Sequence, residues 1–222
     1  ALYRFDAGAT GAFGGDAVLR ASGANSAAIV AAGEGTTVTV TSSQLLASGS
    51  GATGISVFGG ASATMDPLAA LNLGAGAVGA KVDGRTSSID GTLGLSIGAQ
   101  LDSAAKVSGD GQGAVAYAVR NGALLNHSGS VDVSGAQAVG ISISGADSRV
   151  LHTGLVRLSG SGTGVEITDG SAFDNRGSIS VSTGTGISIE GAGSVLTGTG
   201  TSAVMAQDGI AALRLANGGS AR

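Results

Sequence analysis

The residues of this chain that could bind a metal ion or carry out acid–base chemistry are few and widely spaced. The 222 residues contain no cysteine and only two histidines, His127 and His152, which stand 25 positions apart. This spacing could stack the two imidazoles in neighbouring units of a repeat, or let them share a metal ion. Because zinc sites need three or four ligands and no third ligand follows at this spacing, we expect an exposed corner pair without a metal.

Five carboxylates in the second half of the chain are candidates for cleavage of polysaccharides. Glycoside hydrolysis needs two facing carboxylates at a fixed separation, and sugar-cleaving sites usually add aromatic platforms. The segments that hold these acids contain one aromatic residue, Phe173, at a position expected to face inward. The acids are Asp147, Glu166, Asp169, Asp174 and Glu190. We therefore expect a protein that is not an enzyme and needs no cofactor, with a polysaccharide-degrading enzyme as the weaker alternative.

One pair of opposite charges follows the same spacing as the histidines. Asp132 and Arg157 stand 25 positions apart, each in the middle of an alternating segment, SVDVS or LVRLS. Both residues occupy positions expected to face water. An exposed ion pair between neighbouring strands is the predicted arrangement, and such pairs contribute only a few tenths of a kcal/mol.

The sequence repeats a short alternating segment bracketed by glycines. It reads GISVFG at 54–59, GISISG at 140–145 and GISIEG at 186–191. Aligned on their alternation, the segments share one position, and its last five occurrences are separated by 22, 24, 24 and 22 residues. This position is occupied by Ile55, Leu95, Tyr117, Ile141, Val165 and Ile187. A period of this length predicts stacked units, each of which buries its apolar face against its neighbours.

Each repeat contains three extended pieces, which predicts a triangular coil. In the clearest repeat these pieces cover 141–144, 149–151 and 155–159. Apolar residues at every second position should face inward, while Ser142, Glu166 and Ser188 face water. The inward positions are Ile141, Ile143, Val165, Ile167, Ile187 and Ile189. We predict an all-β protein, a right-handed parallel β-helix of roughly eight three-sided coils.

The predicted β-helix forms a single domain over residues 1–222, with one departure from regularity. The period loses its register over 59–94, a segment that contains the only proline, Pro67. We expect a loop or an irregular coil there. Solenoids accommodate insertions as loops on one face, which is often the binding face.

Composition and charge exclude several classes of function. The chain has 42 glycines, 12% charged residues and a net charge of −4, and its 11 Lys and Arg residues are scattered singly. Nucleic-acid binding needs a basic stripe, so it is not expected. No apolar run approaches the roughly 18 residues of a membrane-spanning helix, and the start, ALYRFDAG, lacks the features of a signal peptide. We expect a monomeric chain without a membrane span.

Two segments resemble the passenger domains of Gram-negative autotransporters, the type V secreted proteins, and the pertactin-like group in particular. They cover 124–148 and 173–200 and share the pattern Asn-x-(x-)Gly-Ser-(Ile/Val)-x-Val-Ser, at 126–134 and 175–182. This resemblance implies a β-helix exported across the outer membrane and displayed on the bacterial surface or secreted. It also implies a virulence-associated role in adhesion or in evasion of immunity and complement.

Two kinds of function follow from this resemblance. The chain could be an adhesin or immune-evasion factor that binds a host extracellular or cell-surface protein, or a structural stalk that presents a module outside these residues. For the first function the segment at 59–94 is the expected contact surface, because it mixes apolar and polar side chains. The residues predicted to contact the partner are Met65, Asp66, Leu68, Lys81 and Arg85.

Overall fold

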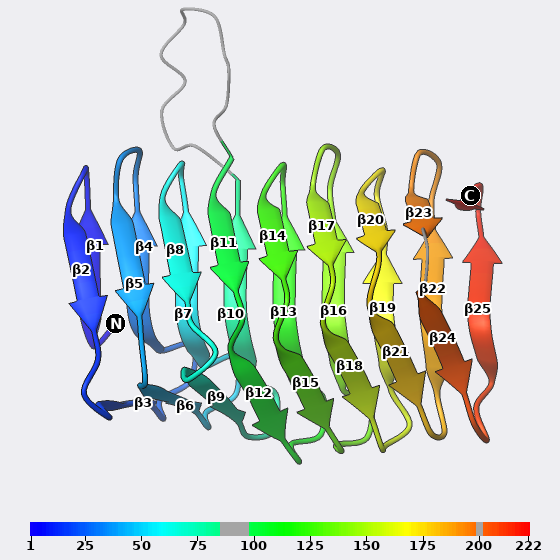
Figure 1. Ribbon diagram of the computed structural model, residues 1–222, viewed down its shortest axis with the longest axis horizontal. Coiled ribbons are helices and arrows are strands. Elements are labelled where there is room, and N and C mark those ends of the chain that lie inside the picture. Colours follow the sequence, from blue (N-terminus) through cyan, green and yellow to red (C-terminus); the bar gives the residue numbers. More distant parts are fainter. Residues whose placement is uncertain (85–97, 199–201) are drawn as a thin grey trace, which may run out of the picture.

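Short segments of alternating apolar and polar residues build the walls of the molecule. The structure is a computed structural model that describes residues 1–84, 98–198 and 202–222. In these residues the chain winds into a solenoid of β-strands and contains no helix, so no helix is present that could cross a membrane. Figure 1 shows the strands as successive coils stacked along one axis.

The strands form three sheets that run the length of the solenoid. Sheet A contains β1 (Tyr3–Asp6), β4 (Ala27–Ala32), β7 (Thr53–Phe58), β10 (Val78–Asp83), β13 (Val115–Arg120), β16 (Val139–Ser144), β19 (Thr163–Ile167), β22 (Thr185–Glu190) and β25 (Ala211–Ala216). Sheet B contains β2 (Thr10–Phe13), β5 (Thr37–Val40), β8 (Ser62–Met65), β11 (Gln100–Ser103), β14 (Leu124–His127), β17 (Arg149–His152), β20 (Ala172–Asn175), β23 (Val195–Gly198) and β26 (Ser220–Ala221). Sheet C contains β3 (Val18–Ala21), β6 (Gln44–Ala47), β9 (Ala70–Leu73), β12 (Lys106–Gly109), β15 (Ser130–Val133), β18 (Leu155–Leu158), β21 (Ser178–Val181) and β24 (Ala203–Ala206).

Each coil contributes one strand to each sheet, so every strand pairs with the strand three places along the chain. Strands β1 to β24 make eight such coils in the described residues, and β25 and β26 begin a ninth. Neighbouring strands are parallel throughout, and the chain winds right-handed as it advances from β1 to β25 (Figure 1). The predicted all-β, three-sided parallel β-helix of about eight coils is therefore confirmed.

The solenoid interior is built from rows of aliphatic side chains that lie one coil apart. In sheet A, Ile141 pairs with Val165 and Val165 pairs with Ile187, and all three are fully buried. The row formed by Ile143, Ile167 and Ile189 is buried in the same way, so all six predicted inward positions are confirmed. Burial of each side chain contributes roughly 1.5–3 kcal/mol, which offsets the ordering cost of a glycine-rich chain.

A glycine precedes the first inward residue of several sheet A strands, including the GIS segments, because the backbones of neighbouring coils approach closely there. A Cβ atom added at Gly164 would lie 2.5 Å from the carbonyl oxygen of Gly186 and 2.7 Å from Cγ2 of Ile179. Gly140 meets Gly164 in the same way. The repeated hexapeptide is thus one wall of a repeated coil, and its glycine fits the entry into sheet A.

Tight turns connect sheet A to sheet B. Both residues of Asn121–Gly122 have positive φ, 55° and 79°, and the N–H of Ala123 closes the turn on the carbonyl of Arg120 at 3.2 Å. Asp169–Gly170 repeats this arrangement with φ of 55° and 78°. Asn-Gly and Asp-Gly favour turns in which both central residues need positive φ. The sequence therefore places these pairs where the chain reverses at a corner.

At three of these corners a buried hydroxyl joins one coil to the preceding coil. Ser148 donates a hydrogen bond to the carbonyl of Ser144 at 2.8 Å and accepts one from the N–H of Gly122 at 3.0 Å. The same pair of bonds is made by Thr36 with Ala32 and Gly8, and by Ser194 with Glu190 and Gly170. These hydroxyls satisfy turn N–H groups that would otherwise be buried without an acceptor.

Replacement of Ser148 by alanine should lower the free energy of unfolding by about 1–3 kcal/mol, because the N–H of Gly122 would lose its acceptor. The measurement is the urea midpoint of the variant against the wild-type chain. Ser180→Ala is the matched control, since Ser180 lies on the outer side of β21, and surface substitutions change stability by about 0.5 kcal/mol or less. Equal midpoints for Ser148→Ala and the control would contradict the bridging role.

The irregular coil expected over 59–94 is corrected for residues 59–84. Strands β8, β9 and β10 of this segment pair in regular register with the coils on both sides. Ala80, and not Leu95, occupies the inward position between Ile55 and Tyr117, and Leu95 lies outside the described residues. The step from Ala80 to Tyr117 is 37 residues, so extra residues in one coil displaced the apparent period.

The two ends of the solenoid carry different kinds of side chain on the inward rows of sheet A. At the first coil Phe13 packs against Tyr3 and Phe5, with ring centroids 5.0 and 5.8 Å apart. At the last described strand of sheet A, Leu213 and Leu215 continue the inward rows but are 41% and 51% exposed. Aromatic rings therefore pack together at the first coil, where Tyr3 is 45% exposed, and aliphatic side chains are similarly exposed at β25.

Candidate functional site

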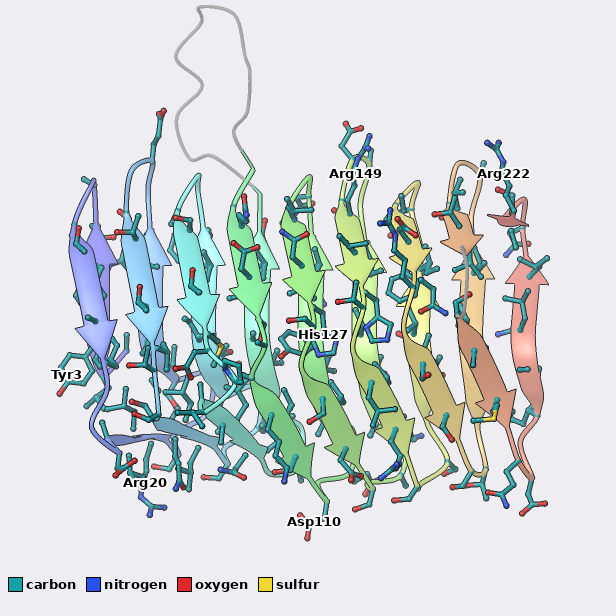
Figure 2. All side chains as sticks on the ribbon, in the orientation of Figure 1. Tyr3, Arg20, Asp110, His127, Arg149 and Arg222 are labelled. Atoms are coloured by element: carbon teal, nitrogen blue, oxygen red, sulfur yellow. The ribbon has the colours of Figure 1, made fainter. Side chains whose placement is uncertain are left out.

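His127 and His152 lie inside the solenoid and form part of an aromatic stack. Their imidazoles are parallel within 7°, with centroids 5.0 Å apart, and they are 1% and 0% exposed. Tyr117 packs on one side of the pair at 5.0 Å and Phe173 on the other at 5.8 Å. Figure 2 labels His127 at the end of β14. The expected exposed corner pair is therefore wrong, whereas stacking in adjacent coils is confirmed.

Strand alternation explains why the two histidines are buried. Leu125 and Val150 face inward on β14 and β17, and each histidine follows its inward neighbour by two residues. Side chains two residues apart lie on the same side of a strand. Extending the predicted piece at 149–151 by one residue would have placed His152 in the interior with Val150, and His127 has the same parity as Leu125.

The hydrogen bonds of the pair exclude the state in which both imidazoles are charged and fit two neutral rings. The two Nδ1 atoms are 2.9 Å apart, so only one of them carries a proton. Nε2 of His152 faces the carbonyl of Ser178 at 3.4 Å and must donate, which makes Nδ1 of His152 the acceptor from His127. Nε2 of His127 is then a bare acceptor, and it has no partner among the described residues.

Burial disfavours the charged form of both histidines. It lowers the pKa of His127 to about 3, with a smaller contribution from His152, and it lowers the pKa of His152 to about 4. Burial likewise raises the pKa of Tyr117, whose hydroxyl lies 2.8 Å from the hydroxyl of Ser103. No group of three His, Cys, Asp or Glu side chains that could hold a metal exists in the described part of the chain. The stack is therefore buried in the core, and His127 lies at the wall of a hollow beside sheet B.

The candidate carboxylates for glycan cleavage are divided between corners and outer faces. Asp147 and Asp169 have positive φ at corners between sheets A and B, and Glu190 at the end of β22 accepts a hydrogen bond from Asn217 at 2.7 Å. Asp174 lies on β20 and pairs with Arg176 at 2.7 Å. Glu166 lies on the outer side of β19, where partial burial raises its pKa. Turn formation and local pairing account for four of these five acids.

The predicted ion pair between Asp132 and Arg157 is present. The two residues are register partners on β15 and β18, and Nη1 of Arg157 lies 3.8 Å from Oδ2 of Asp132. Both side chains are more than half exposed. The pair is a surface contact with a small contribution to stability.

The predicted partner-contact residues do not form one surface. Met65 is buried in the core, which corrects its expected exposure, because it faces inward at the end of β8. Asp66 accepts hydrogen bonds from the N–H groups of Leu68 and Ala69, both at 2.9 Å, and so shapes the turn around Pro67. Leu68 is 73% exposed at this corner.

The other two predicted contact residues are separate from this corner. Lys81 lies on the outer side of β10 in sheet A, and Arg85 lies outside the described residues. The corner residues and Lys81 therefore belong to different sides of the solenoid.

Lys81 lines a hollow of about 440 Å³ over the outer side of sheet A. Arg4 and Lys81 occupy one outward row, and Val30 and Ser56 lie between them in register. Arg120, on the strand after Lys81, also lines the hollow. Sequence reasoning missed Arg4 and Arg120, although their outward parity on sheet A is the same as that of Lys81.

A second hollow of about 340 Å³ follows the corner between sheets B and C. Asp66 and Pro67 line it at one end, and Asp102, Asn126 and Thr153 line it along the following coils. Asn126 donates a hydrogen bond to Asp102 at 2.6 Å. The polar side chains of this hollow are thus partly engaged with one another.

Comparisons of the chain with protein-family models, with curated proteins and with solved structures find no match.

Proposed function

We propose that this chain is a non-enzymatic passenger of the autotransporter type, displayed on a Gram-negative cell surface or secreted, and that it binds a host extracellular protein. The observation that carries this proposal is the continuous outer face of sheet A, where nine strands present one set of outward rows over the whole solenoid. Solenoids use such extended surfaces for binding partner proteins. The repeated Asn-x-(x-)Gly-Ser corner and strand pattern supports the passenger assignment.

The side chains on the outer faces also support protein binding in preference to catalysis. The histidines are buried in the core, and four of the five carboxylates discussed above shape corners or pair with neighbouring side chains. Sheet A instead offers small side chains such as Val30 and Ser56 between cationic ones. Such a face can contact another protein with little rearrangement of its backbone.

A structural stalk is the second candidate function. The regular register of all three sheets favours it, because each coil is fixed by backbone hydrogen bonds and buried rows on both sides. A stalk holds another module away from the cell surface and needs no partner of its own. The two functions therefore differ in whether these 222 residues alone bind a protein.

The test is affinity capture from serum and from solubilised host membranes with the immobilised chain, followed by reconstitution with the purified captured protein. The proposed function predicts a saturable complex with a micromolar or tighter Kd. The control is the same capture with a chain that was unfolded in urea and blocked before it was immobilised. A folded chain that retains no protein above this control would favour the stalk.

A further inference from the structure

The hollow over sheet A concentrates positive charge on a chain whose net charge is −4. Its charged side chains are Arg4, Lys81 and Arg120, and the described side chains that line it include no carboxylate. Arg4 is already paired, since its Nε lies 2.7 Å from Oδ2 of Asp6. Lys81 and Arg120 form no ion pair with the described residues. Two cations at one end of the hollow are thus available to an anionic ligand.

The acidic residues nearest to this hollow, Asp6 and Asp83, lie on the outward row of Arg120 and not on the row of Arg4 and Lys81. Asp6 is engaged by Arg4, and Asp83 accepts a hydrogen bond from Nδ2 of Asn121 at 2.8 Å. Asp83 is also the register partner of Arg120 across β10 and β13. The row that runs from Arg4 through Val30 and Ser56 to Lys81 therefore carries positive charge and no acidic residue. An anionic ligand would bind over this row.

The spacing of the cations matches an extended polypeptide. Three strand-to-strand steps separate Arg4 from Lys81, which amounts to about 14 Å at the usual distance between strands. Four residue steps along an extended chain cover about 13–14 Å, and the side chains of residues i and i+4 point to the same side. An extended segment along the solenoid axis could therefore place one acidic side chain at each end of the hollow.

We infer that the hollow over sheet A binds an extended acidic segment of the partner protein, with carboxylates four residues apart. One carboxylate contacts Lys81 and Arg120, which are diagonal neighbours about 7–8 Å apart on adjacent strands. The other contacts the terminal nitrogens of the Arg4 guanidinium, which is 58% exposed and pairs with Asp6 through Nε. The small side chains of Val30 and Ser56 leave room for the backbone between them. This inference rests on the proposed function, since it names the part of the partner that is recognised.

Charge along the same row favours a short acidic segment over a long polyanionic sugar. Beyond Lys81 the row continues through Ala118 and Ser142 to Glu166, so a long polyanion following it would meet a like charge. The described residues that line the hollow also offer no aromatic ring on which a sugar could stack. Positive charge is therefore confined to a length suited to a few residues of peptide.

The experiment measures binding of a labelled peptide, Gly-Ser-Asp-Ser-Gly-Ser-Asp-Ser-Gly, by fluorescence anisotropy at about 20 mM salt, where surface charges are weakly screened. The peptide should bind the wild-type chain, and its affinity should fall as salt rises. A peptide with asparagines for the aspartates, and one with aspartates five residues apart, should bind about tenfold more weakly.

Variants in which the charge of Lys81 and Arg120 is reversed test whether the peptide binds at the hollow over sheet A. Lys81→Glu with Arg120→Glu should weaken peptide binding by about tenfold or more, and the neutral pair Lys81→Gln with Arg120→Gln should weaken it by less. The matched control is Arg20→Glu with Arg149→Glu, which makes the same change of net charge on sheets C and B. This control should bind the peptide within about twofold of the wild-type chain.

Three results would overturn the inference: no peptide binding, equal loss in the control pair, or binding of heparin but not of the peptide through Lys81 and Arg120. If the chain captures a host protein but ignores the peptide, the inference fails while the proposed function stands. If the peptide binds as described but no host protein is retained, the proposed function fails and the acidic-segment site remains.

Discussion

Lowering the pH from 8 to 5 should reduce the free energy of unfolding by about 4 kcal/mol through His127 and His152 alone. An unfolded histidine has a pKa near 6.5, whereas burial lowers the folded pKa values to about 3 and about 4. The unfolded chain therefore binds more protons below pH 6.5, and each histidine contributes a loss of about 2 kcal/mol at pH 5. Stability from the pair is fully present above pH 6.5 and is lost as the pH falls towards 4.

The geometry of the histidine pair also predicts that the folded chain loses stability as the pH falls. A second proton between the Nδ1 atoms would put two N–H donors face to face at 2.9 Å. The side chains that pack against the imidazoles, Tyr117 and Phe173, carry no negative charge at these pH values. Burial raises the pKa of Glu166, which has the opposite effect on stability at low pH, but Glu166 lies on the outer side of sheet A.

The measurement is a series of urea midpoints from pH 8 to pH 5 for the wild-type chain and for His127→Met with His152→Met. Methionine fits this inward row, because Met65 occupies the same row two coils before His127. The double variant should lose most of the pH dependence, and Glu166, common to both proteins, cancels in the comparison. Parallel curves for the two proteins would contradict the neutral buried pair.

Replacement of Ile167 by aspartate should lower the free energy of unfolding by several kcal/mol, a large share of the 5–15 kcal/mol that stabilises most domains. Ile167 is fully buried between Ile143 and Ile189, so the carboxylate would have no water and no partner. Thermal unfolding followed by circular dichroism measures the effect.

The matched control for this variant is Ser180→Asp on the outer side of β21. Ser180 pairs in register with Arg157, which offers an opposite charge. We expect a change of about 0.5 kcal/mol or less. Equal shifts for Ile167→Asp and Ser180→Asp would mean that the inner and outer sides of the strands had been exchanged.

The architecture could be predicted from the sequence because one strand face is apolar in every coil. Ile141, Val165 and Ile187 repeat at nearly constant spacing, and a single inward row of this kind fixes both register and coil length. The coil around Ala80 was missed for the same reason. Alanine is a weak apolar signal, and the 37 residues from Ala80 to Tyr117 break the spacing on which the alignment depends.

The positions of polar side chains were harder to predict. His127 and His152 are polar residues, which are usually exposed. Here they are buried because they lie at inward positions of their strands and stack between Tyr117 and Phe173. The hollow over sheet A was also not predictable as a unit. Its cations, Arg4, Lys81 and Arg120, are far apart in sequence, and only the pairing of five successive strands brings them to one face.

Protein binding through the outer face of a rigid solenoid is tested most directly by single-cysteine protection. The chain has no cysteine, so Ser56→Cys on sheet A, Thr64→Cys on sheet B and Ser180→Cys on sheet C each introduce one outward thiol. Thiol labelling rates are measured with and without the reconstituted host partner. We predict slower labelling of the sheet A cysteine in the complex and unchanged rates for the cysteines on the other two sheets. Unchanged labelling of all three thiols in a saturated complex would contradict binding through the outer sheet faces.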